Sequence, residues 1–333
     1  MKAITITGKG QVSLSEVPQP EKAVSGHIII KMQAMGINAG DKFFISGNYP
    51  PGFFTESRHH IAGVSGVGRV IALGDGVPEK YLGRNVTVYR SLTAGNEIVG
   101  TWSEYAHLPY LQCALLPDDV DPEDYSGSLV NIITAYAAWR QAIKEGHRGI
   151  VITAGNSDTG KAMLGFCLNA GLPVLSIVRN EEGKVELEEL GARNVLIQGT
   201  ERFQEQFASA CDRLGTTAVF DGVGGALLSE LMPSLPAGAT VYAYGFLGGG
   251  VPLSFHTGVL TKGITIKGFS NFNTETVQDH QQLATALDAI NQVIRQPHFR
   301  FKAAKKFGFD QIGEALSFVP PNGGKAMLHT GQH

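Results

Sequence analysis

The stretch ITAGNSDTGKAM, residues 152–163, determines how the second half of this 333-residue chain is interpreted. Gly155, Gly160 and Lys161 follow the spacing G-x-x-x-x-G-K, which is all but the last position of a nucleotide P-loop. Other folds also hold phosphate on a glycine-rich turn, because backbone N–H groups at a helix N-terminus attract anions. A P-loop needs a Ser or Thr hydroxyl for Mg²⁺ after the lysine, and Ala162 stands there. The pattern therefore argues against ATP.

Strand-like and helix-like segments alternate on both sides of this turn. The pattern predicts strands and their turns within residues 149–155, 173–179, 194–197, 217–225, 239–245 and 263–270. Helices are expected between them, within residues 159–171, 181–192, 202–215 and 226–235. Such alternation favours a parallel sheet covered by helices on both faces, in an α/β fold.

The rest of the chain has a different character. Residues 1 to about 120 contain short β-type runs broken by Gly, Pro and Asn. A long helix is expected within residues 122–146, where apolar residues recur every three or four positions and Gly146 ends the pattern. Further helical segments are expected around 275–296 and at 309–319. The length of the chain suits two domains.

The composition argues against several kinds of partner. With a net charge of −3, nothing indicates binding to nucleic acid or to an anionic membrane surface. No apolar run approaches the ~18 residues of a membrane span, and the N-terminus lacks the apolar run of a secretory signal. Cys113, Cys167 and Cys211 are widely spaced, as is typical of free thiols in a reducing compartment. We therefore expect a cytoplasmic protein.

A dinucleotide-binding turn fits residues 155–160 better than a P-loop does, although the strict G-x-G-x-x-G pattern is absent. Asp158 stands where a glycine would let the backbone approach a pyrophosphate. Its carboxylate would repel that anion unless it caps the helix or pairs with Lys161. The next strand ends at Arg179 and Asn180, where NAD sites carry an acidic residue and NADP sites an arginine. We expect Arg179 to bind the 2′-phosphate of NADP(H), with a solvated surface arginine as the alternative.

Six motifs, taken in order, indicate a family. They are MGINAGDKFFISGNYPP (35–51), GVSGVGRVIALGDGV (63–77), GTWSEYAHLP (100–109), LVNIITAYAAW (129–139), FDGVGG (220–225) and GGKAML (323–328). Their shared order over most of the chain resembles the medium-chain dehydrogenase/reductase superfamily. Within it, the chain is similar to the zinc-independent branch of quinone oxidoreductases and 2-enoyl thioester reductases.

The resemblance implies an architecture that the residue patterns alone did not indicate. It implies a GroES-like β-rich domain formed by residues 1–121 and 269–333, with a Rossmann domain inserted at 122–268. It also implies a substrate cleft between the domains and a homodimer joined through edge strands of the Rossmann sheet.

The resemblance also bears on zinc. Zinc-dependent relatives place their catalytic ligands where this chain has Asn38, Val64 with Ser65, and Val130. Zinc requires thiolate, imidazole or carboxylate donors, so these residues are not a competent set. Three scattered cysteines cannot build a four-cysteine structural site either. We expect no metal.

Individual roles follow from the same resemblance. The catalytic candidates are Tyr49, which would donate a hydrogen bond or a proton to the substrate oxygen, with Asn38 and Thr134. A plain turn residue is the alternative for Tyr49, and a helix residue bonded to the preceding turn is the alternative for Thr134. The cofactor-binding candidates are Asn131, Gly155, Asn156, Ser157, Asp158, Thr159, Gly160, Arg179, Asn180, Gly222, Gly224, Tyr244, Gly245 and Phe246.

Further positions are of interest for the loop, the turn and an apolar pocket. Asp41 is expected to fix its own loop by hydrogen bonds. Lys161 matches no signature of the family, and a surface position is the alternative to a pairing with Asp158. Aromatic residues expected to line an apolar pocket, or simply to fill a core, are Phe53, Phe54, Phe246 and Phe272.

The sequence thus predicts a zinc-independent oxidoreductase that favours NADP(H) over NAD(H). Its substrate would be a small quinone or an activated alkene, such as an enone or enoyl thioester, reduced by hydride transfer. Two alternatives stay open. One is a catalytically silent NADP(H)-binding protein of the same fold, which Asp158 indicates. The other is an alcohol dehydrogenase-like activity without zinc.

Overall fold

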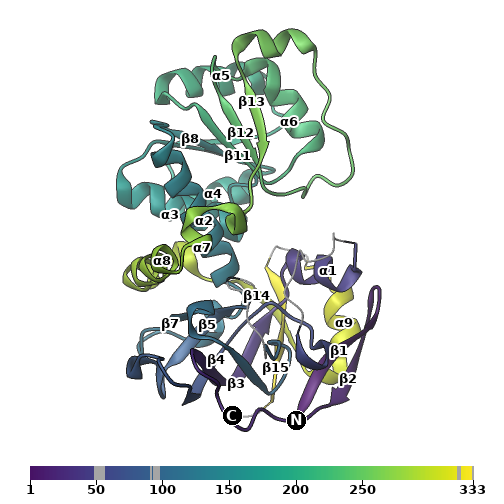
Figure 1. The fold of residues 1–333 in the computed structure, drawn as a ribbon. Helices are drawn as coiled ribbons and strands as arrows, with labels where there is room; N and C mark the ends of the chain where they lie inside the picture. Colours follow the sequence, from purple (N-terminus) through teal and green to yellow (C-terminus); the bar gives the residue numbers. More distant parts are fainter. Residues whose placement is uncertain (49–56, 91, 93–97, 321–323, 332–333) are drawn as a thin grey trace. The chain divides into compact units, whose positions relative to one another are not determined.

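The computed structural model describes residues 1–48, 57–90, 92, 98–320 and 324–331. The chain forms two compact units (Figure 1). The first unit comprises Met1–Val130 and Val277–His333, and the second comprises Asn131–Thr276. A continuous middle segment therefore forms one unit, and both ends of the chain contribute to the other.

A parallel six-stranded sheet forms the centre of the second unit (Figure 1). Its strands are β8 (Ile150–Ile152), β9 (Val174–Val178), β10 (Val195–Ile197), β11 (Ala218–Asp221), β12 (Thr240–Ala243) and β13 (Thr265–Gly268), in the order β10-β9-β8-β11-β12-β13. Within this sheet, the chain passes from β8 outward through β9 to β10, and then returns to the other side of β8 with β11. This reversal creates the topological switch point at which doubly wound sheets bind their ligands.

The helices that accompany this sheet are α2 (Leu129–Lys144), α3 (Asp158–Ala170), α4 (Glu181–Glu189), α5 (Phe203–Leu214), α6 (Gly225–Leu231) and α7 (Glu275–Gln278). Helices α3 to α6 connect strands of this sheet, α2 precedes its first strand, and α7 follows its last strand, where the second unit ends. The core between helices and sheet contains Phe207, Val219 and Val241, each almost fully buried. Helix α3 ends where expected, because Gly171 adopts the left-handed conformation (φ 66°) that closes a helix. The α/β fold predicted from the alternating pattern is confirmed.

The first unit is β-rich. Its larger sheet has the order β14-β15-β3-β4-β5-β7, with β6 beside β3. The strands are β3 (His27–Gly36), β4 (Ser65–Leu73), β5 (Asn85–Tyr89), β6 (Tyr105–Pro109), β7 (Cys113–Leu115), β14 (Ala303–Phe307) and β15 (Lys325–His329); β1 (Lys2–Gly8) and β2 (Gln11–Glu16) form a separate hairpin. Antiparallel pairing of β15 with β3, which sets Met327 opposite Gly36, joins the two ends of the chain. Helices α1 (Ala39–Ser46), α8 (His280–Val293) and α9 (Ile312–Ser317) complete this unit.

Two expected helices are each split. The segment 122–146 forms a 3₁₀ turn at Pro122–Tyr125 and then α2, and the segment around 275–296 forms α7 and α8. The second break has a clear cause, because the side chain of Asp279 accepts hydrogen bonds from the N–H groups of Gln281 and Gln282 and so begins a new helix.

The units change over later than the domain limits of residues 121 and 268 expected from the sequence. Hydrogen bonding explains why residues 269–276 stay with the second unit. Asn271 donates from Nδ2 to Thr134 Oγ1 of α2 over 3.0 Å. The carboxylate of Glu275 pairs with Lys144 of the same helix, with 2.6 Å between Oε1 and Nζ.

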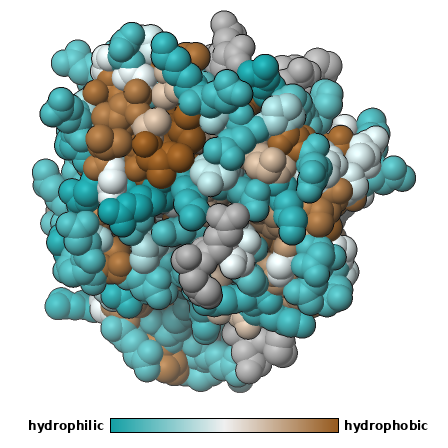
Figure 2. Space-filling view, turned by 90° about the horizontal axis from the view of Figure 1, so that it is seen from below, coloured by the Kyte–Doolittle hydropathy of each residue, from teal (hydrophilic) through white to brown (hydrophobic). Residues whose placement is uncertain are grey.

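The surface and the cysteines add three observations. Hydrophilic residues cover most of the face in Figure 2, and hydrophobic residues gather there in separate patches. None of the helices in the described ranges is long and apolar enough to cross a membrane. Cys113, Cys167 and Cys211 are free and buried, as their spacing predicted.

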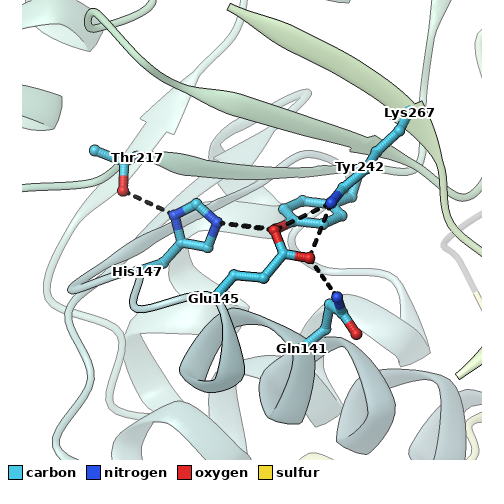
Figure 3. A network of polar contacts seen from close by, with 6 residues as sticks. All are labelled: Gln141, Glu145, His147, Thr217, Tyr242 and Lys267. Atoms are coloured by element: carbon cyan, nitrogen blue, oxygen red, sulfur yellow. Dashed lines mark hydrogen bonds and ion pairs between the residues drawn. The ribbon is translucent and has the colours of Figure 1, made fainter. Parts of the chain in front are cut away.

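A polar network fastens the C-terminal end of α2 to the sheet (Figure 3). Tyr242 of β12 donates to Glu145 Oε2 over 2.6 Å, and Lys267 of β13 lies 2.9 and 3.0 Å from the two carboxylate oxygens. His147 Nε2 lies 2.8 Å from the Tyr242 hydroxyl, and its Nδ1 lies 2.9 Å from Thr217 Oγ1. Because the phenolic proton points to Glu145, the imidazole donates through Nε2 and accepts at Nδ1.

The network keeps Glu145 ionised. Partial burial opposes ionisation, but hydrogen bonds from Tyr242, Lys267 and Gln141 outweigh it and lower the pKa of Glu145 to about 2. Burial and the Glu145 carboxylate raise the pKa of Tyr242, so the phenol stays protonated and continues to donate. The network thereby fixes α2, which also carries Asn131 and Thr134 at its other end.

The network predicts a defined pH dependence of stability. A carboxyl group whose folded-state pKa is depressed stabilises the fold above its ordinary pKa of 4.5, and this contribution is lost as the pH falls toward 2. The stability difference between wild type and Glu145→Gln should therefore be constant above about pH 5 and shrink below it. Melting temperatures from pH 7 to 3 test this, with exposed Glu182→Gln as control. A difference that does not change down to pH 3 would contradict the assignment.

Candidate functional site

The turn that joins β8 to α3 is tight and closely packed. Ser157 caps the helix by accepting the N–H of Gly160 over 3.1 Å. A Cβ on Gly160 would lie 2.4 Å from the carbonyl oxygen of Gly155, and a Cβ on Gly155 would lie 2.9 Å from the Cβ of Ser176. Both glycines are therefore required for the close packing of turn, helix and sheet. The N-terminus of α3 is consequently held at the carboxyl end of β8.

Asp158 is the first residue of α3, and its carboxylate is paired. The ammonium of Lys161 lies 3.5 Å from Asp158 Oδ1 and 3.1 Å from Glu186 Oε1. Asn156 Nδ2 lies 3.4 Å from the other oxygen of Glu186. The surface position expected for Lys161 is wrong: the residue is only 7% exposed, because it packs between the two carboxylates. The pairing with Asp158, the other expectation for this residue, is confirmed.

Two residues of α2 reach polar partners within the same unit. Asn131 accepts at Oδ1 from the hydroxyl of Thr159 over 3.0 Å. Thr134 accepts at Oγ1 from Asn271, as described above. Asn131 and Thr159 are both cofactor-binding candidates, and the structure brings them together beside the turn.

A second glycine-rich turn follows β11, on the other side of the switch point. The carboxylate of Asp221 is fully buried. It accepts the hydroxyl of Thr153 over 2.6 Å and the N–H of Gly224 over 2.8 Å. Thr153 Oγ1 in turn accepts the N–H of Gly222 over 2.9 Å. Since Thr153 follows β8 and Asp221 ends β11, these bonds join the two turns.

The Asp221 carboxyl is a group that sequence analysis did not single out. Burial raises its pKa, although the hydrogen bonds from Thr153, Val223 and Gly224 oppose that shift. Its position inside FDGVGG, before two glycines, was the available signal.

The turn after β12 packs closely against this second turn. A Cβ on Gly222 would lie 2.8 Å from the hydroxyl of Tyr244, and a Cβ on Gly245 would lie 2.8 Å from the carbonyl oxygen of Gly222. Gly224 has φ 72°, a conformation that favours glycine. Phe246, by contrast, is 70% exposed. The candidates Gly222, Gly224, Tyr244 and Gly245 therefore form one packed group, and Phe246 projects from it.

The end of β9 presents Arg179 to solvent. The residue is exposed, and its guanidinium engages no partner among the residues that the structure describes. Asn180 caps α4 by accepting the N–H of Gly183 over 3.0 Å. The Asn180 side-chain oxygen is thus used for the helix cap, whereas Arg179 is available to a ligand. A 2′-phosphate role for Arg179 stays a prediction.

In the first unit, Asn38 is the centre of a buried polar cluster. Its Nδ2 donates to Ser65 Oγ over 3.1 Å and to the carbonyl of Gly127 over 3.0 Å. Its Oδ1 accepts from the ammonium of Lys325 over 2.5 Å. Asn38 and Ser65 occupy two positions compared above with zinc ligands, and here they bind each other. Lys325 is a cation beside a candidate catalytic residue that sequence analysis did not identify, although it lies in the quoted motif GGKAML.

Asp41 fixes its loop, as expected. It is fully buried and accepts the N–H of Asn38 and that of Val64, each over 2.8 Å. Burial raises the pKa of Asp41 to about 6, even though these N–H groups and the charges of Lys325 and Arg90 favour the ionised form. Asp41 is therefore a positioning group for the backbone on both sides of Asn38.

Some expectations fall outside what the structure describes. Tyr49, Phe53 and Phe54 lie in the segment 49–56, which is outside the described residues. Phe272 is half-buried. Within the described ranges, no group of three or more His, Cys, Asp or Glu side chains is placed to hold a metal ion. The prediction of a zinc-free site stays a prediction.

The geometry defines a class of protein: a dinucleotide-binding α/β unit inserted into a β-rich unit. Comparisons with known proteins give the family. The zinc-binding dehydrogenase model matches residues 159–292, and the alcohol dehydrogenase GroES-like domain model matches residues 24–118. The chain belongs to the medium-chain dehydrogenase/reductase superfamily, in the branch that holds quinone oxidoreductases and enoyl reductases.

Curated relatives are distant. The chain is 27% identical over 253 residues to the mitochondrial enoyl-[acyl-carrier-protein] reductase of Bos taurus, a match that covers 74% of this chain and 65% of the bovine protein. It is 25% identical over 275 residues to a protein named probable quinone oxidoreductase from Leishmania amazonensis, covering 78% and 76%.

Solved structures share the whole fold. Escherichia coli quinone oxidoreductase complexed with NADPH matches with a TM-score of 0.76 at 18% identity, covering 99% of this chain and 100% of that one. The quinone oxidoreductase of Pseudomonas syringae pv. Tomato matches with a TM-score of 0.76 at 19% identity, covering 98% and 99%. At these identities the likeness establishes the fold.

The cluster around Asn38 predicts a stability effect. Replacement of Asn38 by Ala would leave the buried Gly127 carbonyl and the Ser65 hydroxyl without their donor, which should lower the free energy of unfolding by about 1–3 kcal/mol. Urea unfolding of Asn38→Ala measures this effect, with exposed Asn273→Ala as the matched control. Equal midpoints for the two variants would contradict the structural importance of the Asn38 bonds.

Proposed function

We propose that this protein is an NADPH-dependent oxidoreductase that reduces a quinone or an activated alkene, an enone or an enoyl thioester, by hydride transfer. The observation that carries the proposal is the pair of glycine turns joined by Asp221 at the switch point of the parallel sheet, with Arg179 exposed at the end of the next strand. Relatives named as quinone oxidoreductases and enoyl reductases support the reaction class.

The residues of the turns fit a dinucleotide. Gly155 and Gly160 keep the β8 turn close to the sheet, and Ser157 caps α3 so that the helix N-terminus faces the place where a pyrophosphate would bind. The rest of the dinucleotide would lie close to the backbone of Gly222, Gly224 and Gly245, which have no side chain to obstruct it. Arg179 would pair with a 2′-phosphate, which is the feature that separates NADPH from NADH.

The chemistry divides between the cofactor and the chain. A bound nicotinamide supplies the hydride. In our proposal the chain supplies orientation and a proton: Tyr49 donates a hydrogen bond toward the substrate oxygen and delivers the proton that this oxygen or the α-carbon gains. The two amide N–H groups of Asn38 are taken up by Ser65 and Gly127, so Asn38 would act by fixing the polar cluster around it. Thr134 would orient the carboxamide end of the cofactor. No zinc is used, since Asn38 and Ser65 satisfy each other where metal ligands would be needed.

We further propose a cytoplasmic homodimer joined through β13. This strand is the edge of the parallel sheet, and Thr265, Ile266 and Gly268 on it are exposed. Large apolar side chains near it in sequence are also exposed: Phe246, Leu247, Val251, Leu253 and Leu260. An unpaired edge flanked by apolar residues suits strand pairing with a second copy. Light scattering on the purified protein should give twice the chain mass of 35.5 kDa, and a monomer at working concentration would contradict the proposal.

Arg179 predicts the cofactor preference. Hydrogen bonds to a charged group contribute about 1.5–3 kcal/mol, so wild type should bind NADPH more tightly than NADH by about that amount. Arg179→Ala should abolish most of the preference and leave the NADH affinity unchanged. Fluorescence titrations with both nucleotides measure this, and exposed Arg193→Ala is the control. Equal NADPH and NADH affinities in the wild type would remove the assigned role.

Tyr49 predicts the behaviour of the chemical step. Tyr49→Phe removes the hydroxyl and keeps the ring, so kcat should fall while NADPH binding stays the same. A general acid typically contributes about 10²–10⁴-fold, and the loss should appear in turnover with at least one of quinone, enone and enoyl thioester acceptors. Full activity of the variant on every accepted substrate would exclude Tyr49 from the mechanism.

A further inference from the structure

The phosphate-binding turn carries a fixed ion cluster formed by Lys161, Asp158 and Glu186. One buried ammonium is shared by two carboxylates, at 3.5 Å from Asp158 Oδ1 and 3.1 Å from Glu186 Oε1. Asp158 and Lys161 lie on the first turn of α3, whereas Glu186 comes from α4. The cluster is well defined because the Lys161 and Asp158 side chains are only 9% and 11% exposed.

Counting charges shows why the cluster matters to an anionic ligand. Two carboxylates and one ammonium leave one net negative charge beside the helix N-terminus. That terminus carries partial positive charge, and the carboxylate of an acidic residue in the first turn partly neutralises this charge. A bound pyrophosphate would therefore compete with Asp158 for the same favourable potential.

Lys161 is not placed as a direct phosphate ligand. Its ammonium is enclosed by the two carboxylates and is largely inaccessible to solvent. Burial alone would lower the pKa of Lys161, but Asp158 and Glu186 outweigh it and raise the pKa, so the side chain remains a cation. Its charge acts on the site through the position it imposes on Asp158.

We propose that Asp158 lowers the affinity of the dinucleotide site for its ligand. Lys161 is a positioning residue, which limits the repulsion by holding the Asp158 carboxylate to its side of α3. Glu186 competes with Asp158 for the same cation. This inference rests on the proposed function. It adds that the ion cluster of this chain sets how tightly the pyrophosphate is bound. The exposed cation of Arg179 would then supply a larger share of the attraction.

A double-mutant cycle tests the proposal. The proteins are wild type, Asp158→Asn, Lys161→Met and the double variant, each titrated with NADPH by fluorescence at several salt concentrations. Asp158→Asn should tighten binding about tenfold and Lys161→Met should weaken it about tenfold, the scale of coupling between charged groups in contact. In the Asp158→Asn background, Lys161→Met should have little effect, because Lys161 acts through Asp158. Melting temperatures of the ligand-free proteins supply a second readout.

A second pair of variants leaves Lys161 in place in case Lys161→Met folds poorly. Glu186→Gln gives Asp158 sole use of the ammonium, so NADPH should bind slightly more tightly. Glu189→Gln removes the same charge from an exposed position of the same helix and should change nothing. Tighter binding in Glu186→Gln alone supports the cluster, and equal effects in both variants would contradict it.

The outcomes separate this inference from the proposed function. If Lys161→Met lowers the NADPH affinity equally in both backgrounds, the lysine contacts phosphate directly. If the melting temperature changes without a change in NADPH affinity, the ion pair is purely structural. Either result overturns the inference and leaves the proposed function standing. If Asp158→Asn binds NADPH and wild type does not, Asp158 is the inhibitory charge in its strongest form. If neither protein binds NADPH or NADH, the proposed function itself fails.

Discussion

The buried carboxylate of Asp221 is the constraint on which the dinucleotide-binding unit depends. Its oxygens accept the Thr153 hydroxyl and the Gly224 N–H, and Thr153 accepts the N–H of Gly222. One fully buried group therefore joins the turn after β8 to the turn after β11, on the two sides of the point where the strand order reverses. Breaking it would leave a buried polar group unsatisfied, which is expensive in free energy. These bonds hold the glycines of both turns in place.

The two candidate regions use charge in opposite ways. In the β-rich unit, Asn38 is held by neutral donors and acceptors and by the ammonium of Lys325. At the α3 turn, Lys161 is shared between two carboxylates and leaves a negative balance. The Asn38 cluster thus holds a cation next to an amide. The α3 turn instead carries an internal ion cluster with one net negative charge.

Local sequence patterns predicted the parallel sheet and its helices because each strand and helix carries its own period and its own terminator, such as Gly171 after α3. They failed where a side chain overrode the pattern: Asp279 begins a new helix inside an apparently continuous one. The domain limits came from the resemblance, and both boundaries between the units lie later in the chain than it implied. Contacts such as Thr134–Asn271 keep residues 269–276 in the second unit, whereas residues 122–130 belong to the first.

The candidate site was predicted in part. The turn glycines follow from local turn chemistry, and a pairing with Lys161 was one of two ways for the Asp158 carboxylate to avoid repelling a phosphate. Glu186 and Lys325 could not be foreseen, because each reaches its partner from a distant part of the chain: Glu186 from α4, and Lys325 from β15, where it meets Asn38. Sequence spacing carries no information about such contacts without the fold.

Hydrogen exchange with and without NADPH tests the central claim most directly, because it reports on individual backbone N–H groups. The account predicts that NADPH slows exchange in segments 155–161 and 222–225, with little change in the β1–β2 hairpin of the other unit. NADPH binding that leaves both turns unchanged, or protection confined to other segments, would contradict the assignment of these turns to the dinucleotide.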